Sequence, residues 1–386
     1  MYDVLIKGGR LIDPAQHIDA LMDIAVNGDK IALVSPDIAA RDGKKIIDAT
    51  GRIITPGLID MHCHVFDALS KYADVDIAGV RQGVTTVVDG GSSGQALFSA
   101  FPKYIIPRAR TTVYCFLHIS SMGIVIAPEI KSLDNIDVAA TSSVIKSYPD
   151  IIKGVKLRMV GAFVARNGVE IFQTAKKIAK EFGLPIMVHI GDKECQATTS
   201  LTQAFLPLME RGDILTHVFT ARQGSAMLPD GTFIPELRAA MERGVVLDIA
   251  HGGSNMSFAV ARRGLSQGIL PTVISSDLSS GTLHGPAYGL TVTMSKMLSL
   301  GLSLNQVITM TTINPAKAIN IADRKGSLKP GMDADVSILE VAFGKRKLVD
   351  GENETLLATE LIMPRMALKA GKTVLPRLMA LPESVA

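Results

Sequence analysis

The middle of the chain repeats one pattern, a short apolar run that ends in an ionisable residue. From residue 62 to residue 277 the pattern advances in seven steps of about 31 residues, close to the roughly 30 residues of one strand–helix–strand unit. Eight such units close into a barrel of about 250 residues. The runs end at His62, Asp89, His118, Lys156, His189, His217, His251 and Asp277.

Helical patterns fill the gaps between these runs. Within residues 169–182 apolar side chains recur at helical spacing, Gly183 follows as a stop signal, and Pro185 opens the next apolar run. The same cycle returns in IPELRAAMERG followed by VVLDIAH. This alternation predicts an α/β fold, a (β/α)8 TIM-type barrel over residues 57–321. Active sites of such barrels lie at the C-terminal ends of the strands, where the ionisable residues gather.

The two ends of the chain show strand patterns without the intervening helices. Asn27-Gly28 separates two apolar runs, which is a strong signal for a hairpin. Near the other end, residues 334–341 and 366–375 are strand-like, with Gly371 at a turn. We expect residues 1–56 and 322–386 to form one small, discontinuous β-sandwich domain.

The composition limits the choice of partners. Lys plus Arg exceed Asp plus Glu by only 3, so neither nucleic acid nor an anionic membrane is expected as a partner. The sequence contains no run of about 18 apolar residues, the length that spans a bilayer. The three cysteines lie far apart in no CxxC pair, which indicates a reducing, cytoplasmic location. A small-molecule substrate is the expected partner. The sequence leaves open whether the chain forms a homo-oligomer.

His62 and His64 stand two residues apart at the end of the first run. On a strand their side chains point to the same face, where both can bind one metal ion. Taken alone, the pair also fits two polar residues at a strand end. In the fourth run, strand alternation places Lys156 and Arg158 on the inward face and Lys153 on the outward face.

A lysine inside a barrel is costly as a bare cation. A neutral Lys156 could instead take up carbon dioxide, and the resulting carbamate would be an anionic ligand able to bridge two metals. The alternative is a lysine that extends to the barrel mouth. Singly, His189 and His217 fit packed, hydrogen-bonded histidines, and Asp277 fits a helix N-cap. Together at strand ends, these residues favour a metal site.

The whole set resembles the amidohydrolase superfamily, in the branch with two metals and a carboxylated lysine. The segments TPGLIDMHCH and GSLKPGMDADV are similar to that family's flanking segments, so the resemblance covers nearly the whole chain. It implies that His62, His64 and Asp277 hold one divalent ion, with zinc as the expected metal. It also implies that His189 and His217 hold a second ion and that Lys156, carboxylated by carbon dioxide, bridges the two.

Departures within the superfamily narrow the expected activity. Val65, Phe66 and Asp67 follow the histidine pair, where dihydroorotases usually carry an arginine that binds the substrate carboxylate. The glutamate that related adenine deaminases carry soon after this pair is also absent. The segments DGGSSG, KLRM and DIAHGGSNMSF instead resemble a branch whose members look like deacetylases of small acyl esters or amides.

We therefore expect a metal-dependent hydrolase that cleaves an ester or amide bond of a small acylated acid, such as an acetylated hydroxy or amino acid. A metal-bridging hydroxide would be the nucleophile, and Asp277 would be the catalytic residue that moves its proton. Arg158 would pair with a substrate carboxylate; the alternative is an ion pair with an acid at the barrel mouth. His118 and His251 would contact substrate, with structural hydrogen bonding as the alternative.

Two other functions stay open at this point. One is a cyclic amidase of the dihydroorotase type, or a nucleobase deaminase, on the same fold. The other is a non-catalytic barrel that acts as an assembly protein. The second is disfavoured because every expected ligand position is filled, including the aspartate that would transfer the proton.

Overall fold

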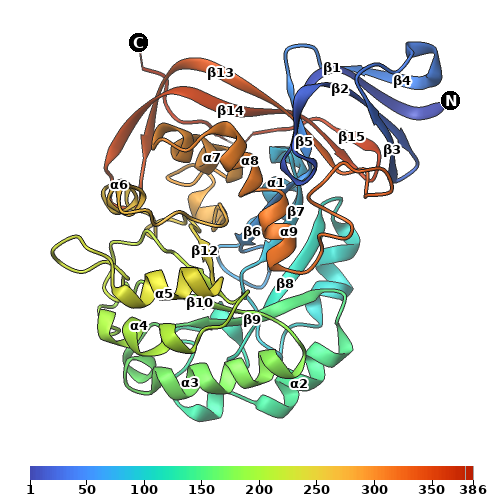
Figure 1. The fold of residues 1–386 in the computed structure, drawn as a ribbon. Coiled ribbons are helices and arrows are strands. Elements are labelled where there is room, and N and C mark those ends of the chain that lie inside the picture. Colours follow the sequence, from blue (N-terminus) through green and yellow to red (C-terminus); the bar gives the residue numbers. More distant parts are fainter. Residues whose placement is uncertain (379, 386) are drawn as a thin grey trace.

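The computed structural model describes residues 1–378 and 380–385, and its central element is a curled, all-parallel sheet (Figure 1). Neighbouring strands are hydrogen-bonded in chain order, and each adjacent pair is joined by a crossover. The seven strands are β6 (Leu58–Cys63), β7 (Val84–Asp89), β8 (Thr112–His118), β9 (Ile152–Arg158), β10 (Ile186–His189), β11 (Ile214–Thr216) and β12 (Val246–Asp248). The predicted parallel α/β architecture is therefore present.

Helices cover the outer face of this sheet. The pattern predicted at residues 169–182 covers the second half of α3 (Ala162–Glu181) and its C-cap Phe182, and Phe172, Ala175 and Ala179 are buried there. No helix among the described residues is long and apolar enough to cross a lipid bilayer. The α-helices are α1 (Val75–Ala78), α2 (Val138–Ser147), α3 (Ala162–Glu181), α4 (Thr199–Phe205), α5 (Pro235–Arg243), α6 (Phe258–Ser266), α7 (Leu290–Ser299), α8 (Leu304–Thr309) and α9 (Ile313–Ala318).

The eighth strand, predicted to end at Asp277, is not a regular strand. This segment makes only single parallel bridges, Val273 with Asp248 of β12 and Leu278 with Cys63 of β6. The backbone N–H of Ile274 donates to Met310 O instead of to a neighbouring strand. Other backbone hydrogen bonds still join this segment to both neighbours, since Val273 N donates to Leu247 O of β12 and Asp277 N donates to His62 O of β6. Seven strands are regular, and a fully closed eight-stranded barrel stays a prediction.

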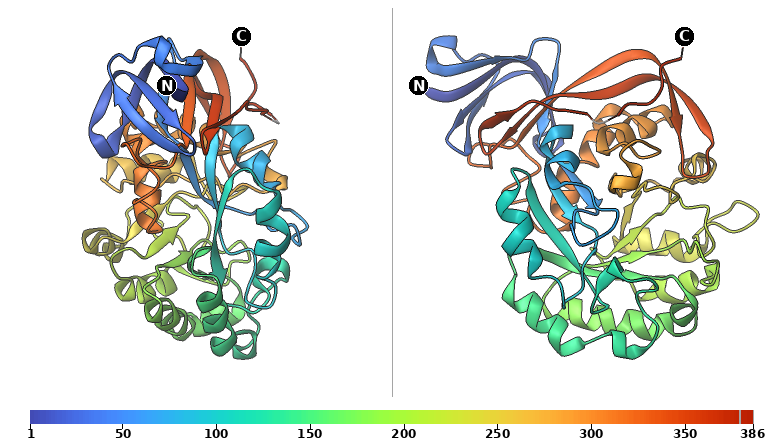
Figure 2. Two further views of the ribbon diagram at one scale, coloured as in Figure 1. Left: turned by 90° about the vertical axis from the view of Figure 1, so that its right-hand side faces the viewer. Right: turned by 180° about the vertical axis from the view of Figure 1, so that it is seen from behind.

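The two chain ends meet in a second sheet, as predicted, and it lies beside the barrel-like part in Figures 1 and 2. Its strands are β1 (Tyr2–Asp13), β2 (Ile18–Asn27), β3 (Lys30–Ser35), β4 (Gly43–Asp48), β5 (Ile53–Pro56), β13 (Val336–Val349), β14 (Thr355–Lys369) and β15 (Lys372–Val374). The predicted hairpin at Asn27-Gly28 is present, with Gly28 and Asp29 forming the turn and Asn27 pairing with Lys30.

The hydrogen bonding shows how the chain ends are joined. β5 pairs with β1 on one side and with β13 on the other, so the strands of both chain ends form one continuous sheet of eight. The β-sandwich arrangement of this region stays a prediction. The boundaries at residues 56 and 322 stay a prediction.

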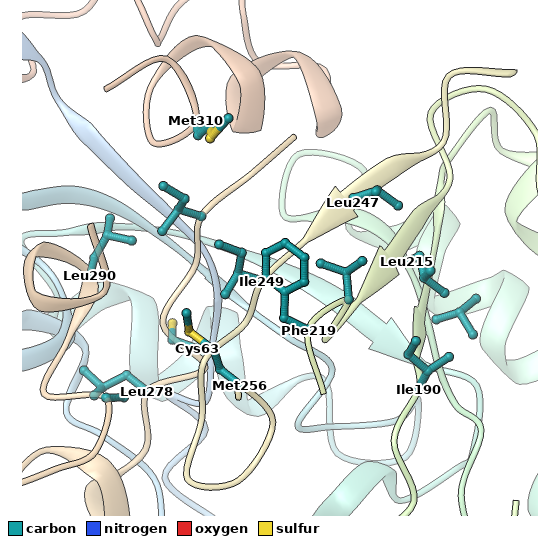
Figure 3. Packing of buried hydrophobic residues seen from close by; sticks show 14 of the residues in the cluster. Cys63, Ile190, Leu215, Phe219, Leu247, Ile249, Met256, Leu278, Leu290 and Met310 are labelled. Atoms are coloured by element: carbon teal, nitrogen blue, oxygen red, sulfur yellow. The ribbon is translucent and has the colours of Figure 1, made fainter. Parts of the chain in front are cut away.

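Buried apolar side chains fill the layer between the parallel sheet and its helices. The largest buried cluster joins strand residues such as Leu157 and Leu247 with helix residues such as Phe172. Figure 3 shows part of this cluster, including Phe219 and Cys63. Each fully buried side chain of this size contributes roughly 1.5–3 kcal/mol, so the layer holds the strand ends in fixed positions.

Candidate metal centre

Three predicted ligands meet at the C-terminal end of β6. His64 Nε2 lies 3.1 Å from Asp277 Oδ1, and His62 Nε2 lies 3.7 Å from the same oxygen. One donor atom from each residue falls within 4.8 Å of the other two. Imidazole and carboxylate are ligands that zinc prefers, and three protein ligands are typical of a catalytic zinc site. This donor set fits one divalent ion.

The other two predicted histidines lie beside this group. The rings of His189 and His217 are 4.2 Å apart between centroids, and the ring of His217 is 5.3 Å from that of His62. His189 ends β10, and His217 follows β11. All four histidines also line one cavity of about 200 Å³ together with Lys156 and Asp277. The six residues predicted from the sequence as metal ligands therefore lie around one cavity, although they come from five separate strand ends.

Lys156 is the buried lysine of β9. Its side chain is 1% exposed and its Nζ lies 3.3 Å from His62 Nε2, whereas Lys153 is only half-buried and donates to Pro149 O. Strand alternation predicted this difference. Burial lowers the pKa of Lys156 to about 8. About one such lysine in ten is then neutral at pH 7, which is the form that can take up carbon dioxide.

Hydrogen bonds to backbone carbonyls fix which ring nitrogen of His189 and of His217 carries the proton. His217 Nδ1 donates to Ala250 O at 2.8 Å, and His189 Nε2 donates to Gly191 O at 3.2 Å. A carbonyl only accepts, so each ring keeps a lone pair on its other nitrogen. Burial also lowers the pKa of His62, His189 and His217, that of His217 to about 3. Neutral imidazoles are the form that binds metal.

Two buried carboxylates that the sequence analysis did not assign support the histidine pair of β6. Asp248 Oδ2 lies 3.4 Å from His62 Nδ1 and accepts a 2.7 Å hydrogen bond from Thr216 Oγ1. On the other side, His64 Nδ1 contacts Ser92 Oγ, which donates to Asp89 Oδ2 at 2.7 Å. Partners of this kind orient a ligating histidine and raise its basicity. Asp248 could have been noticed because it ends the run VVLD.

The backbone is strained at two of the candidate ligands. His217 has φ 71° and Asp277 has φ 48°, in the left-handed region that residues with a side chain rarely adopt. Such strain costs of order 1–3 kcal/mol and clusters at functional sites. Gly91 has φ 91°, and a Cβ there would lie 2.4 Å from Lys156 Cγ. The glycines of DGGSSG thus leave room for the buried lysine.

The electrostatic environment keeps Asp277 ionised. Burial alone would raise the pKa of this carboxyl group. The hydrogen bond with His64 opposes burial, and the pKa lies below its usual range. Asp277 is therefore an acceptor for a metal ion or a proton.

Arg158 points toward the cavity but already has a partner. Its side chain is 29% exposed and forms an ion pair with Glu129, which is 7% exposed. The alternative that the sequence left open, an ion pair with an acid at the barrel mouth, is therefore present. A second cavity, of about 270 Å³, shares Arg158, His189 and Asn255 with the first. Contact of Arg158 with a substrate carboxylate stays a prediction.

The two remaining candidates differ from each other. His251 is buried, and protein groups occupy both of its ring nitrogens: Gly252 O lies 2.8 Å from Nδ1 and Lys296 Nζ lies 2.6 Å from Nε2. These bonds favour the structural alternative for His251, and its substrate contact stays a prediction. His118 is bound by Ser120 at Nδ1, while its buried Nε2 has no partner. Its substrate contact stays a prediction.

Comparisons with known proteins agree with this geometry. Residues 53–356 match the profile of the amidohydrolase family. A deacetylase of Agrobacterium fabrum is 32% identical over 91% of this chain and 86% of its own length. A deacetylase of Enterococcus faecalis is 32% identical over 96% of this chain and 98% of its own length.

Two solved structures have the same fold over almost the whole chain. An adenine deaminase superimposes with a TM-score of 0.89 at 31% identity, covering 97% of this chain and 100% of the other. A dihydroorotase gives a TM-score of 0.86 at 30% identity, covering 97% of both chains. With the profile match over most of the sequence, these likenesses establish that the chain is a hydrolase that belongs to the amidohydrolase family.

Proposed function

We propose that this protein removes the acyl group from a small acylated acid, as an ester or amide hydrolase of the deacetylase type. The observation that carries the proposal is the cavity in which four histidines, Lys156 and Asp277 meet beside Arg158. A cationic fork next to a hydrolytic centre favours a substrate that carries a carboxylate. The names of the two deacetylases at 32% identity support the same activity.

The donor set fits two divalent ions, with His62, His64 and Asp277 at one and His189 and His217 at the other. Lys156, carboxylated by carbon dioxide, would bridge them. When bound, such ions polarise a carbonyl group and lower the pKa of water to about 7. The neutral, hydrogen-bonded imidazoles keep their lone pairs toward the cavity and so hold this set in one arrangement.

Asp277 is the residue of this chain that moves the proton. As water adds its oxygen to the acyl carbon, the carboxylate of Asp277 accepts the proton that the water loses. The same proton then passes to the leaving oxygen or nitrogen as its bond to the acyl carbon breaks. The products are the free acid of the acyl group and the deacylated hydroxy or amino acid. A general acid–base group of this kind contributes typically 10²–10⁴-fold to the rate.

Arg158 orients the substrate in this proposal. Its guanidinium has further N–H groups beyond the one that donates to Glu129. A substrate carboxylate can therefore bind to Arg158 while the ion pair with Glu129 persists. The shared wall of the two cavities would place the acyl group at the histidines and the remainder of the acid in the second cavity.

A substrate screen tests the proposal. Zinc-reconstituted protein is assayed with acetyl esters of hydroxy acids, N-acetyl amino acids, adenine and dihydroorotate, and Asp277→Asn serves as the control for contaminating hydrolases. We expect cleavage of acylated acids that falls by a hundredfold or more in the control variant. Cleavage of neutral esters alone, or equal rates in the variant, would contradict the proposal.

A nucleobase deaminase is the second candidate, because the adenine deaminase structure superimposes on nearly the whole chain. Release of ammonia from adenine in the same screen would identify it. Ring opening of dihydroorotate would identify a cyclic amidase instead.

A further inference from the structure

The two carboxylate oxygens of Asp277 have different neighbours. Oδ1 faces the histidines of β6, at 3.1 Å from His64 Nε2. Oδ2 faces the other way and accepts a hydrogen bond of 3.3 Å from Asn255 Nδ2. Within the described part of the chain, the amide of Asn255 is the one side-chain donor to the oxygen that does not face the candidate ligands. Asn255 also lines both cavities.

The loop that carries Asn255 runs directly along the irregular eighth segment. The backbone N–H of His251 donates to Ser275 O, and that of Gly252 donates to Ser276 O at 2.9 Å. Gly252 has φ 56°, and a Cβ there would lie 2.3 Å from Asp277 Oδ2. Any other residue at position 252 would therefore push the carboxylate away from its present position.

A buried lysine anchors the start of this loop. Lys296 of α7 is fully buried, and its Nζ donates to His251 Nε2 at 2.6 Å, to Pro286 O at 2.6 Å and to Val349 O at 2.7 Å. The three hydrogen bonds use all three protons of the ammonium group. One side chain thus connects the loop after β12, the segment before α7 and the end of β13.

The turn between β13 and β14 holds the far end of the same loop. Gly351 N donates to Met256 O at 2.8 Å, and Phe258 N donates to Asp350 Oδ2 at 2.7 Å. Asn255 therefore lies between two points that are fixed by the sheet of the chain ends. The motif DIAHGGSNMSF therefore contacts three candidate ligands: Asp248 lies beside His62, Ala250 O accepts from His217, and Asn255 donates to Asp277.

We propose that Asn255 is a positioning residue for Asp277, and that Lys296 and the turn between β13 and β14 hold Asn255 in place. The amide fixes the rotation of the carboxylate, so that Oδ1 stays toward the histidines while Oδ2, held by Asn255, exchanges the proton of the reaction. This inference rests on the proposed function, because it assigns Asn255 a part in the same proton transfer. Side chains that are held by a supporting hydrogen bond keep a productive geometry that loosely held ones lose.

A double-mutant cycle tests whether Asn255 acts through Asp277. Asn255→Leu keeps the approximate size of the side chain but removes the donor, and it is made in wild-type protein and in Asp277→Asn. Asn167→Ala is the matched control, because Asn167 donates to a backbone carbonyl on the outer helix α3. The zinc-reconstituted variants are compared in kcat, KM, metal content and melting temperature.

We expect Asn255→Leu to lower kcat roughly tenfold or more, with KM, metal content and melting temperature close to wild type. In the Asp277→Asn background the same change should alter kcat by less than about twofold, since coupled residues do not act additively. A rise in KM alone would show a substrate contact instead. Equal losses in both backgrounds, or a loss of metal, would also overturn the proposal.

A spectroscopic measurement keeps the test independent of the substrate. The absorption spectrum of cobalt-substituted protein reports how Asp277 binds the ion. We expect Asn255→Leu to change this spectrum and Asn167→Ala to leave it unchanged. An unchanged spectrum in Asn255→Leu would overturn the positioning role. If no acylated acid is cleaved by wild-type protein but the spectrum changes as expected, the proposed function fails and the positioning role stands.

Discussion

Replacing Asp248 with asparagine should weaken metal binding without destabilising the metal-free protein. Asp248 is fully buried and accepts from Thr216 Oγ1 at 2.7 Å and from Ser275 Oγ at 2.6 Å, with His62 Nδ1 at 3.4 Å. In Asp248→Asn the amide can place an N–H group opposite the N–H of His62. The imidazole then keeps only Thr216 Oγ1, 3.1 Å from Nδ1, as an acceptor, or it moves its proton to Nε2, the nitrogen that faces Asp277.

The expected magnitude follows from this geometry. Partners of ligating histidines are worth 10–100-fold in metal affinity, which is about 1.4–2.7 kcal/mol. The stability of the metal-free protein should not fall, because burial raises the pKa of Asp248 and makes its charged carboxylate costly. A neutral amide removes that cost. Metal affinity and stability should therefore separate in this variant.

Competition with a chromogenic chelator measures the affinity, and thermal melting in EDTA measures the stability. Ser275→Ala is the matched control, because it removes the donor to Asp248 Oδ1 and leaves the side that faces His62 intact. We expect the control to bind zinc within about threefold of wild type. Tight zinc binding by Asp248→Asn, together with loss of zinc by His62→Ala, would refute the argument that Asp248 orients His62.

Three further results are expected. Lys156→Ala should abolish activity and lower the metal content, with partial rescue by a short carboxylic acid, whereas Lys153→Ala should be mild; the opposite ranking would show that the inward face of β9 is misassigned. Arg158→Met should lower kcat/KM for acidic substrates roughly ten- to a hundredfold and less for neutral esters; equal losses would make Arg158 structural. Metal-free protein should lose stability in urea as the pH falls from about 6.5 toward 3, because His217 stays neutral when folded but binds a proton when unfolded; stability independent of pH over that range would contradict this.

Much of the fold could be predicted from the sequence because ionisable residues mark the C-terminal ends of the strands in this architecture. Periodicity and spacing located the parallel strands, α3 and the hairpin at Asn27-Gly28. They did not predict that the segment ending at Asp277 is irregular, with Ile274 N donating to Met310 O instead of to a neighbouring strand. Nor does periodicity show that β5 pairs on both edges and so joins the chain ends into one sheet.

The candidate site was predictable where residue type and strand parity decide, and not where contacts between distant segments decide. Parity distinguished Lys156 from Lys153 because alternate side chains face opposite sides of a strand. The roles of Asn255 and Lys296 depend on loops whose course the sequence pattern does not encode. His251 follows a strand end as the candidate ligands do, yet its Nε2 already has Lys296 as a hydrogen-bond partner.

Metal content is the measurement that tests the two-metal account most directly. Purified protein is stripped with chelator, reconstituted with zinc and bicarbonate, and analysed by inductively coupled plasma mass spectrometry. The account predicts two zinc ions per chain in wild-type protein. One ion or fewer per chain after reconstitution would contradict the assignment of His189, His217 and carboxylated Lys156 to a second metal.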